Sequence, residues 1–432
     1  MSEKIRYVEC MFTDLFGRLK SMVIPCRPVD SIDELRKDPA LKQGASVDGS
    51  SVTGLANVEA SDLRLEPDVS SLIELPYTSQ RTAGVMCSIR KKVIPGQDSL
   101  YPLDARSVFL SVYEKCLGTR QLKVKIEPEF HFITMEGELF DYGEYADTYP
   151  QNPGADTLLR IASTIQDAGM GVKVAHHEHG HSQVEIEIDF EDARKAADNI
   201  VLFKNIARAI AREDGFDVTF MPKPFEGAAG NGLHCHLQLW DGDKNLFGHG
   251  GSELSETAMM FVAGLIQHAP AITAFANPTV NSYKRLVPHH EAPVYVCWGP
   301  TNRTVLIRVP LFVDSQKAAV ELRSPDPACN PYLLFAAIIA AGMDGISRKM
   351  KPPEPCTRDV FAMSDEQRES LGITTLPSNL GAALDALEHD SVLIEALGQQ
   401  LVRKYVSLKR REWSDYCNHV VTEWEWDTYS GT

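Results

Sequence analysis

Four short segments of the chain alternate apolar residues with residues that can bind a metal ion. Period-two alternation predicts a β-strand with one apolar and one polar face. The segments are KVKIEPEFHFI (123–133), VEIEIDF (184–190), LHCHLQL (233–239) and VELR (320–323). Their polar faces carry mostly carboxylates, with histidines in the third segment: Glu127, Glu129, His131, Glu185, Glu187, Asp189, His234, His236, Gln238, Glu321 and Arg323.

An antiparallel strand with a solvated polar face is the alternative interpretation of each segment taken alone. Solvated faces usually mix Lys, Thr, Ser and Gln, whereas several carboxylates on one sheet repel one another unless a cation neutralises them. The four segments together therefore favour a metal site. Carboxylates with a minority of imidazoles suit Mg²⁺ or Mn²⁺ rather than zinc. Two ions held in this way can stabilise a transferring phosphoryl group.

Arginines gather in a largely apolar stretch farther along the chain: Arg285, Arg303, Arg308 and Arg323. A guanidinium in such surroundings needs an anionic partner, which is either a structural carboxylate or a substrate phosphate or carboxylate. Beside a metal site, the substrate interpretation is favoured. No G-x-x-x-x-G-K-[ST] occurs, so a P-loop is excluded. The glycine-rich run 227–232 is interpreted as a turn into the strand at 233.

The strands and helices expected to position these residues follow a pattern that predicts an α+β protein. A hairpin is expected from strands at 5–12 and 19–24 around a turn at 15–18, and Asp104 is a predicted N-cap. No regular βαβ rhythm is visible. We place a domain boundary near residue 100, which gives domains at 1–100 and 101–432. Helices are expected at 104–117, 155–168, 191–213, 253–275, 330–349 and 391–419.

Composition narrows the functional class. A chain of 432 residues usually forms two domains. Its net charge of −16 argues against nucleic acid or an anionic membrane as a partner. The N-terminus lacks the features of a signal peptide, and the apolar run 333–343 is too short to span a bilayer. Nine cysteines without a C-x-x-C pair predict neither a disulfide framework nor a zinc site, and favour a reducing cytoplasm.

The chain resembles the glutamine synthetase family along nearly its whole length. The resemblance rests on long motifs that occur in the family's order. They are DGSS (48–51), SDLRLEPD (61–68), EPEF (127–130), HHE (176–178), Q-x-E (183–185), FMPKPF (220–225), GLHCH (232–236), NPTVNSYKRLVP (277–288), EAP (291–293), NRT-x-x-IR-x-P (302–310) and E-x-RSPDP-x-x-NPYL (321–333).

This resemblance implies an N-terminal β-grasp domain and a C-terminal catalytic domain built on a curved antiparallel sheet flanked by helices. It implies a ligase that joins glutamate to ammonia or an amine and uses ATP with Mg²⁺ or Mn²⁺. The family assembles as a dodecamer of two hexameric rings with sites shared between subunits. One metal ion would bind Glu129, Glu178 and Glu185, and the second Glu127, His234 and Glu321.

The same resemblance implies roles for the remaining site residues. Gly230, Arg285 and Arg323 would bind glutamate, and Glu291 would lie on a flap over the site. His236, Arg303 and Arg308 would bind ATP, with Arg303 also catalytic. Asp48 of a neighbouring subunit would bind and deprotonate the incoming ammonium. In this reaction the γ-carboxyl of glutamate first attacks ATP to give an acyl phosphate, which a neutral amine then attacks. The histidines near Glu178 are expected mainly to support the site or lie at the surface: His176, His177, His179 and His181.

Several positions depart from the usual pattern of the family. Where the family has D-N-G-S-G, this chain has Ala228-Ala229-Gly230-Asn231-Gly232. Two arginines that are paired in the family are replaced by Ala318 and Ala319. The two residues before the flap glutamate are His289 and His290. The segment 298–303 reads W-G-x-x-N-R and resembles that of γ-glutamylamine ligases of the family. Asn57 stands where some members of the family have an arginine used in product inhibition. These departures lie near the substrates rather than the metals, and they favour an amine larger than ammonium.

Alternatives remain at this stage. Neutral drift in an ammonia-using glutamine synthetase would explain the departures and agrees with the intact DGSS motif. A catalytically silent scaffold would predict lost metal ligands, yet all six are present. A guanidino kinase shares the catalytic-domain architecture but would lack the DGSS domain and the flap glutamate.

Overall fold

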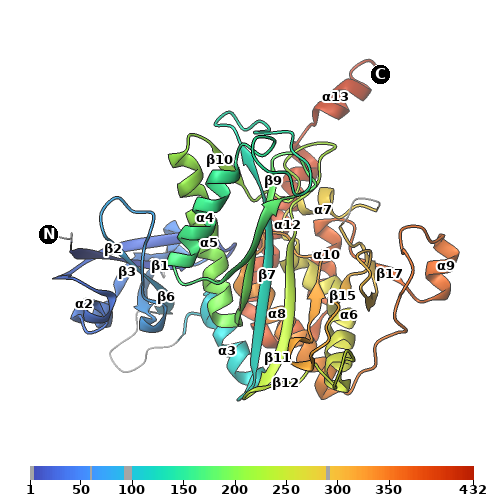
Figure 1. The fold of residues 1–432 in the computed structure, drawn as a ribbon, viewed down its shortest axis with the longest axis horizontal. Helices are drawn as coiled ribbons and strands as arrows, with labels where there is room; N and C mark the ends of the chain where they lie inside the picture. The colour runs from blue at the N-terminus through green and yellow to red at the C-terminus, as the bar shows by residue number, and fades with distance from the viewer. Residues whose placement is uncertain (1–3, 59–60, 92–99, 289–291) are drawn as a thin grey trace.

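The computed structural model describes residues 4–58, 61–91, 100–288 and 292–432. The first strands form a small sheet at one side of the molecule, drawn in blue in Figure 1. Its strand order is β2-β1-β6-β4-β3, with β5 paired to β6. The strands are β1 (Ile5–Thr13), β2 (Leu19–Val29), β3 (Ala45–Asp48), β4 (Asp62–Pro67), β5 (Ile73–Glu74) and β6 (Ala83–Lys91). The predicted hairpin is confirmed, since β1 and β2 pair antiparallel from Thr13 and Leu19 outward.

Short helices accompany this sheet. They are α1 (Ile32–Leu35), α2 (Pro39–Gln43) and the 3-10 turns η1 (Gly49–Ser51) and η3 (Val69–Ser71). Asp48 caps η1, because its carboxylate accepts the backbone N–H of Ser50. The proposed domain boundary near residue 100 lies between β6 and α3 (Ala105–Leu117). Asp104 caps α3 as predicted, since its side chain accepts the backbone N–H of Ser107.

A larger sheet runs through the middle of the molecule (Figure 1). Its order is β14-β15-β16-β11-β7-β9-β8, with β10 paired to β7 and β12 to β11. The strands are β7 (Gln121–Ile133), β8 (Val172–His177), β9 (Gln183–Asp192), β10 (Asp217–Thr219), β11 (Leu233–Asp241), β12 (Lys244–Asn245), β14 (Trp298–Pro300), β15 (Ile307–Val309) and β16 (Val320–Leu322). The four predicted metal-binding strands are therefore neighbours in one sheet. The pairing within this sheet is antiparallel except at one edge, where β14 and β15 pair parallel.

The apolar faces of these strands form the core, as the alternation predicted. Val124, Phe130, Val184 and Leu237 are fully buried. The helix α8 (Pro331–Ser347) contributes an almost completely buried run. The other long helices are α4 (Ala155–Asp167), α5 (Ala193–Glu213), α6 (Glu256–Ala276) and α12 (Gln399–His419). In the described residues, α6 is the one helix long and apolar enough to cross a membrane, and most of it is buried inside the protein.

The remaining elements lie toward the C-terminus. They are α7 (Ser282–Arg285), β13 (Tyr295–Val296), η4 (Ser315–Lys317), α9 (Asp365–Ser370), β17 (Thr374–Thr375), α10 (Leu380–Glu388), α11 (Ser391–Leu397) and α13 (Glu423–Tyr429). The single helix expected at 391–419 is divided into α11 and α12, because Gly398 has a φ of +88° that a helix cannot contain. The helix α13 projects from the body of the protein and leaves Trp424 and Trp426 exposed (Figure 1).

Candidate active site

Two adjoining cavities lie over the polar face of the large sheet. The first, which we call the Arg285 cavity, has a volume of about 570 Å³. The second, the Glu185 cavity, has a volume of about 500 Å³. Both are lined by Glu129, His179, His234 and Arg323, so the two spaces meet at these side chains.

Strand register brings the predicted carboxylates and histidines together in the Glu185 cavity. Glu129 on β7 lies opposite Glu185 on β9, and His234 on β11 lies opposite Glu127. His236 lies opposite Glu321 on β16. Antiparallel neighbours place directly opposed side chains on the same face, which explains how residues far apart in the sequence gather here.

Donor atoms close enough to share one cation form three groups, in each of which all donor atoms lie within 4.8 Å of one another. These groups differ in part from the predicted ligand sets. Glu178 and Glu185 form one with His176, whereas Glu129 belongs to none of the three. Glu127 joins Glu185 and His234 in the second group, and His236 and Glu321 in the third. His236, predicted at ATP, thus lies among the candidate metal ligands, with Nε2 2.9 Å from Oε1 of Glu127.

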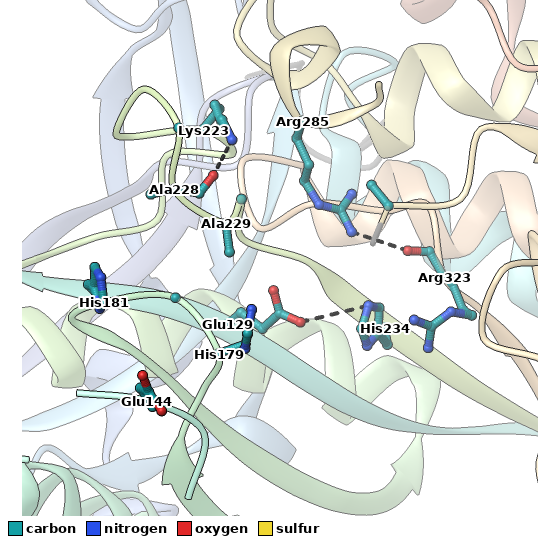
Figure 2. A pocket seen from close by; sticks show the side chains of 14 residues that line it. Glu129, Glu144, His179, His181, Lys223, Ala228, Ala229, His234, Arg285 and Arg323 are labelled. Atoms are coloured by element: carbon teal, nitrogen blue, oxygen red, sulfur yellow. Dashed lines mark hydrogen bonds and ion pairs between the residues drawn. The ribbon is translucent and has the colours of Figure 1, made fainter. Parts of the chain in front are cut away.

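Glu129 is held by neutral donors. Its Oε2 accepts the backbone N–H of Gly232 at 2.6 Å and the amide of Gln183 at 3.2 Å. Its Oε1 lies 3.8 Å from Nε2 of His234, an approach visible in Figure 2. Gly232 permits this arrangement, because a Cβ there would lie 2.7 Å from Nη2 of Arg285 and 2.9 Å from Nε2 of His234.

The electrostatics of the Glu185 cavity fit a cation. Burial raises the pKa of Glu185 well above its ordinary value, and the carboxylates of Glu129, Glu127 and Glu178 raise it further. Burial also raises the pKa of Glu129, although Arg285 opposes the shift. Buried carboxylates that repel one another are stabilised by a divalent cation between them. The oxygen-rich donor set with imidazoles suits Mg²⁺ or Mn²⁺.

Glu127 and Glu321 differ from Glu185 because positive groups surround them. Burial opposes ionisation of Glu127, but contacts with His234 and His236 hold its pKa well below the ordinary range. Burial likewise opposes ionisation of Glu321, whose pKa is lowered by Arg323 and neighbouring positive groups. Nη1 of Arg323 lies 2.6 Å from Oε1 of Glu321, and Arg308 contacts its other oxygen.

A lysine that the sequence interpretation passed over touches this group. Lys125 on β7 is buried, and its ammonium contacts Glu127 and lies 2.8 Å from Oε2 of Glu187. Lys173 reaches the same oxygen of Glu187 at 2.9 Å. The alternation of β7 carried the signal, because Lys125 falls on the polar face two residues before Glu127.

The Arg285 cavity is divided by charge. Arg285 and Arg323 lie on one side of Glu129 in Figure 2, and Glu144 and His181 on the other. Arg285 is buried, and its Nη1 donates to the carbonyl of Ser324 at 2.7 Å. Gly230 lines the cavity, and a Cβ there would lie 2.6 Å from the carbonyl of Pro222. Ala228 and Ala229 form part of the wall between these sides.

The other predicted residues lie as follows. Arg303 and Arg308 line the Glu185 cavity with the carboxylates. Asp48 is exposed and lines neither cavity. Hydrogen bonds from Ser50 and Ser51 lower the pKa of Asp48 to about 2. Glu291, His289 and His290 lie outside the described residues.

The four nearby histidines have separate environments. His177 is buried, with Nε2 2.9 Å from Oδ1 of Asp141 and Nδ1 2.7 Å from the carbonyl of Glu178, so it supports the loop. His179 and His181 line the Arg285 cavity. His176 lies closer to the metal group than the sequence interpretation assumed, since its Nε2 is 3.5 Å from Glu178.

Comparison with known proteins identifies the family to which the chain belongs. The family described as glutamine synthetase, catalytic domain, matches residues 109–429, and its β-grasp domain matches residues 4–92. The chain belongs to the glutamine synthetase family. It is therefore an ATP-dependent ligase that forms a carbon–nitrogen bond, in a family that binds glutamate, ATP, divalent metals and ammonia or an amine. The predicted α+β fold with a β-grasp domain is confirmed.

Relatives in this family carry two kinds of name. Glutamine synthetase of Pyrococcus abyssi is 42% identical over 98% of this chain and 96% of its own. That of Methanocaldococcus jannaschii is 38% identical over 98% and 95%. A solved structure described as apo GmaS without ligand has a TM-score of 0.86 and 34% identity over 99% of this chain and 97% of its own. A GmaS/ADP complex has a TM-score of 0.87 and 33% identity over 100% and 98%.

Proposed function

We propose that this ligase joins the γ-carboxyl of glutamate to an organic amine in preference to ammonia, and converts ATP to ADP and phosphate. The observation that carries the proposal is the wall of the Arg285 cavity, where Ala228 and Ala229 stand in place of the family's aspartate and asparagine. Small apolar side chains leave room for the carbon chain of an amine. The likeness to two solved GmaS structures, one of them an ADP complex, supports this proposal.

The proposed roles of the residues follow their positions. Arg285 and Arg323 bind the glutamate carboxylate, with the backbone at Gly230 close by. Arg303 and Arg308 bind the ATP phosphates beside His236. The divalent metals, when bound, supply Lewis-acid stabilisation of the phosphoryl oxygens. Their proposed ligands are Glu127, Glu129, Glu178, Glu185, His234 and Glu321, with His176 and His236 as further candidates.

The glutamate γ-carboxylate attacks the ATP γ-phosphate and displaces ADP, giving γ-glutamyl phosphate, because a free carboxylate is a poor acylating agent; attack by the amine later releases the phosphate. The amine must then lose a proton before it attacks. We propose that Asp48 of a neighbouring subunit accepts this proton, because Asp48 is ionised and exposed and lines neither cavity of its own chain. Glu291 is proposed to assist from the flap. This arrangement requires a closed assembly, which we propose is a dodecamer in the cytoplasm.

Ammonia remains the second candidate nucleophile. The curated relatives named glutamine synthetase reach 42% identity over nearly the whole chain. The DGSS segment is intact, and its Asp48 retains both serine hydroxyl bonds at 2.7 and 2.8 Å. Both observations agree with binding of a small ammonium ion.

Steady-state phosphate release distinguishes these candidates. The assay combines ATP, glutamate and Mg²⁺ with ammonia, methylamine, ethylamine or ethanolamine. We expect at least one organic amine to give a higher kcat/KM than ammonia. Ammonia as the best nucleophile by tenfold or more would refute the proposal.

A substitution tests whether the alanine wall causes the preference. Ala229→Asn restores the family's side chain, and we expect it to lower kcat/KM for the organic amine at least tenfold relative to ammonia. Ala396→Asn on α11 introduces the same side chain away from both cavities and should leave the ratio unchanged. An unchanged ratio in both variants would show that Ala229 does not set the preference between the amines.

A further inference from the structure

A third cavity lies between the N-terminal sheet and the catalytic part of the chain. It shares no lining residue with the two cavities described above. It has a volume of about 660 Å³, and we call it the Arg208 cavity. The β1–β2 turn at 16–19 and Thr53 form one wall. The helices α5 and α12 form much of the other, with the loop residues 278–279 and 327–328.

The charges of this cavity contrast with those of the whole chain. Its walls carry the cationic residues Arg18, Lys204, Arg208 and Lys409 against one carboxylate, Glu412. The chain as a whole has a net charge of −16. A protein with such an excess of acidic residues has carboxylates available to neutralise cations, so a cavity lined by four cations and one carboxylate is unexpected.

Only one of the four cations has a carboxylate partner in the described part of the chain. Nζ of Lys409 lies 2.7 Å from Oε2 of Glu412. Nζ of Lys204 donates to the neutral carbonyl of Cys329 at 3.4 Å, and the carboxylate of Asp326 acts on its charge without forming an ion pair with it. Among residues that the structure describes, no carboxylate oxygen lies within 4.0 Å of the side-chain nitrogens of Arg18, Lys204 or Arg208.

Two of these cations are partly or fully removed from water, since Lys204 is half-buried and Lys409 is buried, whereas Arg18 and Arg208 are exposed. Burial lowers the pKa of Lys204, and the charge of Arg208 lowers it further. Burial lowers the pKa of Arg208 as well; the charge of Asp217 opposes this shift, whereas Arg212 and Arg18 add to it. Like charges that line one cavity repel one another, and an anion bound between them relieves this repulsion.

Aromatic rings hold two of the cations in place. The guanidinium of Arg208 lies 5.2 Å from the ring centre of Phe220. The ammonium of Lys409 lies 4.4 Å from the ring centre of Phe16. Such cation–π contacts restrict the side chains before a ligand arrives, which reduces the entropy lost on binding.

We propose that the Arg208 cavity binds a compact anion with two or more negative charges, either a phosphorylated or a polycarboxylate small molecule. The ligand would contact Arg18 from the β1–β2 turn and Lys204 and Arg208 from α5. It would thereby join the N-terminal sheet to the catalytic part of the chain and stabilise the folded protein. This site does not depend on the identity of the amine.

Calorimetric titration of the full chain tests the proposal with inorganic pyrophosphate and, separately, with citrate at constant ionic strength. We expect saturable binding of at least one of them. Arg18→Gln and Arg208→Gln should each weaken it tenfold or more, whereas Arg208→Lys keeps the charge and should retain most of it. Arg403→Gln, which removes a charge from α12 outside the cavity, should change it less than twofold. Binding of pyrophosphate alone identifies a phosphoryl ligand, and binding of citrate alone a polycarboxylate.

A variant of the catalytic site separates the two anion sites. Arg308→Gln weakens phosphate binding in the Glu185 cavity, so binding that persists in this variant belongs elsewhere. Loss of all binding in Arg308→Gln, or no binding beyond the ionic-strength control, would overturn the proposal. A fall in assembly mass in Arg208→Gln without any anion binding would also overturn it, because the occupant would then be a second copy of the chain.

Discussion

The position of Lys125 affects both the charge and the geometry of the proposed metal site. Its buried ammonium contacts Glu127 and Glu187, so a fixed positive charge lies beside a proposed metal ligand. Two effects oppose each other here. The charge repels an incoming metal ion, whereas the contact orients the carboxylate. At about 5 Å and an effective dielectric constant of about 20, the repulsion between the ammonium and a divalent ion amounts to roughly 7 kcal/mol, which exceeds a typical orienting hydrogen bond of about 1 kcal/mol.

We therefore expect Lys125→Met to bind Mg²⁺ or Mn²⁺ at least tenfold more tightly, with a lower kcat because Glu127 loses its orientation. Calorimetric titration and steady-state kinetics measure the two effects separately. Lys173→Met is the matched control, because Lys173 is largely exposed and reaches Glu187 without contacting Glu127. It should change the metal affinity less than threefold. Weaker metal binding in Lys125→Met would show that orientation outweighs repulsion.

The pKa shifts of Glu185 and Glu129 predict how pH affects the metal-free protein. Both pKa values are raised above the ordinary value of 4.5. The native state therefore holds protons that the unfolded state releases, so stability falls as pH rises from about 4.5 through the raised values. A metal ion must displace these protons, so its affinity rises over the same window.

Thermal unfolding between pH 5.5 and 8.5, with and without Mg²⁺, measures both trends. We expect Tm of the metal-free protein to fall with pH while the increase caused by Mg²⁺ grows. Glu185→Gln should flatten the metal-free trend, because the amide cannot titrate. A Mg²⁺ effect that is independent of pH would contradict the assignment of Glu185 and Glu129 to the metal.

At the scale of elements, the sequence was most informative about the four strands. Period-two alternation identified them because one face packs into the core and the other faces the cavities. It could not show that Glu129 lies opposite Glu185, since register depends on pairing between distant segments. The sequence interpretation also passed over Lys125, because a lysine on a polar face resembles a solvated residue. The domain boundary and the residue roles stay predictions.

The helices show a second limit. Periodicity identified the long amphipathic helices, but it joined α11 and α12 into one, because the apolar spacing continues across Gly398. The left-handed φ of +88° at Gly398 ends the first helix. Short helices such as α9 and α13 were missed, because a few turns on the surface carry too little periodicity to detect.

Gly398→Ala should destabilise the protein, since a residue with a Cβ is strained at this φ. We expect a loss of about 1–2 kcal/mol in the free energy of unfolding, measured by chemical denaturation. Phosphate release at 25 °C should be unchanged, because Gly398 lines neither active-site cavity. Gly431→Ala adds the same methyl group where no atom lies within 4 Å and φ is not positive, and should be neutral. Equal stability of both variants would show that the turn adapts.

At the scale of the whole molecule, an ion pair and a hydrogen bond join the N-terminal sheet to the catalytic part of the chain. Arg106 on α3 is buried, and its Nη2 lies 2.8 Å from Asp68 of the N-terminal part, while Asp198 on α5, 2.9 Å away, holds the same guanidinium from within the catalytic part. The side-chain amide of Asn330 donates to the carbonyl of Leu15 at 3.1 Å. These contacts hold the N-terminal sheet, and with it Asp48, in a defined orientation.

Complementation tests the proposed sharing of sites between subunits. Asp48→Ala and Arg285→Ala should each reduce phosphate release at least a hundredfold, because one removes the proposed proton acceptor and the other a glutamate contact. Mixed assemblies, formed by unfolding and refolding the two variants together, should regain activity, since some interfaces pair an intact Asp48 with an intact Arg285. The variants refolded separately and then mixed are the control. A fully active monomer by light scattering would contradict shared sites.

The exposed position of Asp48 has a kinetic consequence. If a neighbour completes each site, a dissociated chain has no proton acceptor, and turnover per chain depends on how much enzyme is present. Dilution below the dissociation constant of the assembly should then lower specific activity over time, and concentrating the enzyme should restore it after a lag. Cells could therefore set the rate of amide synthesis through the abundance of this one polypeptide more steeply than in proportion to it.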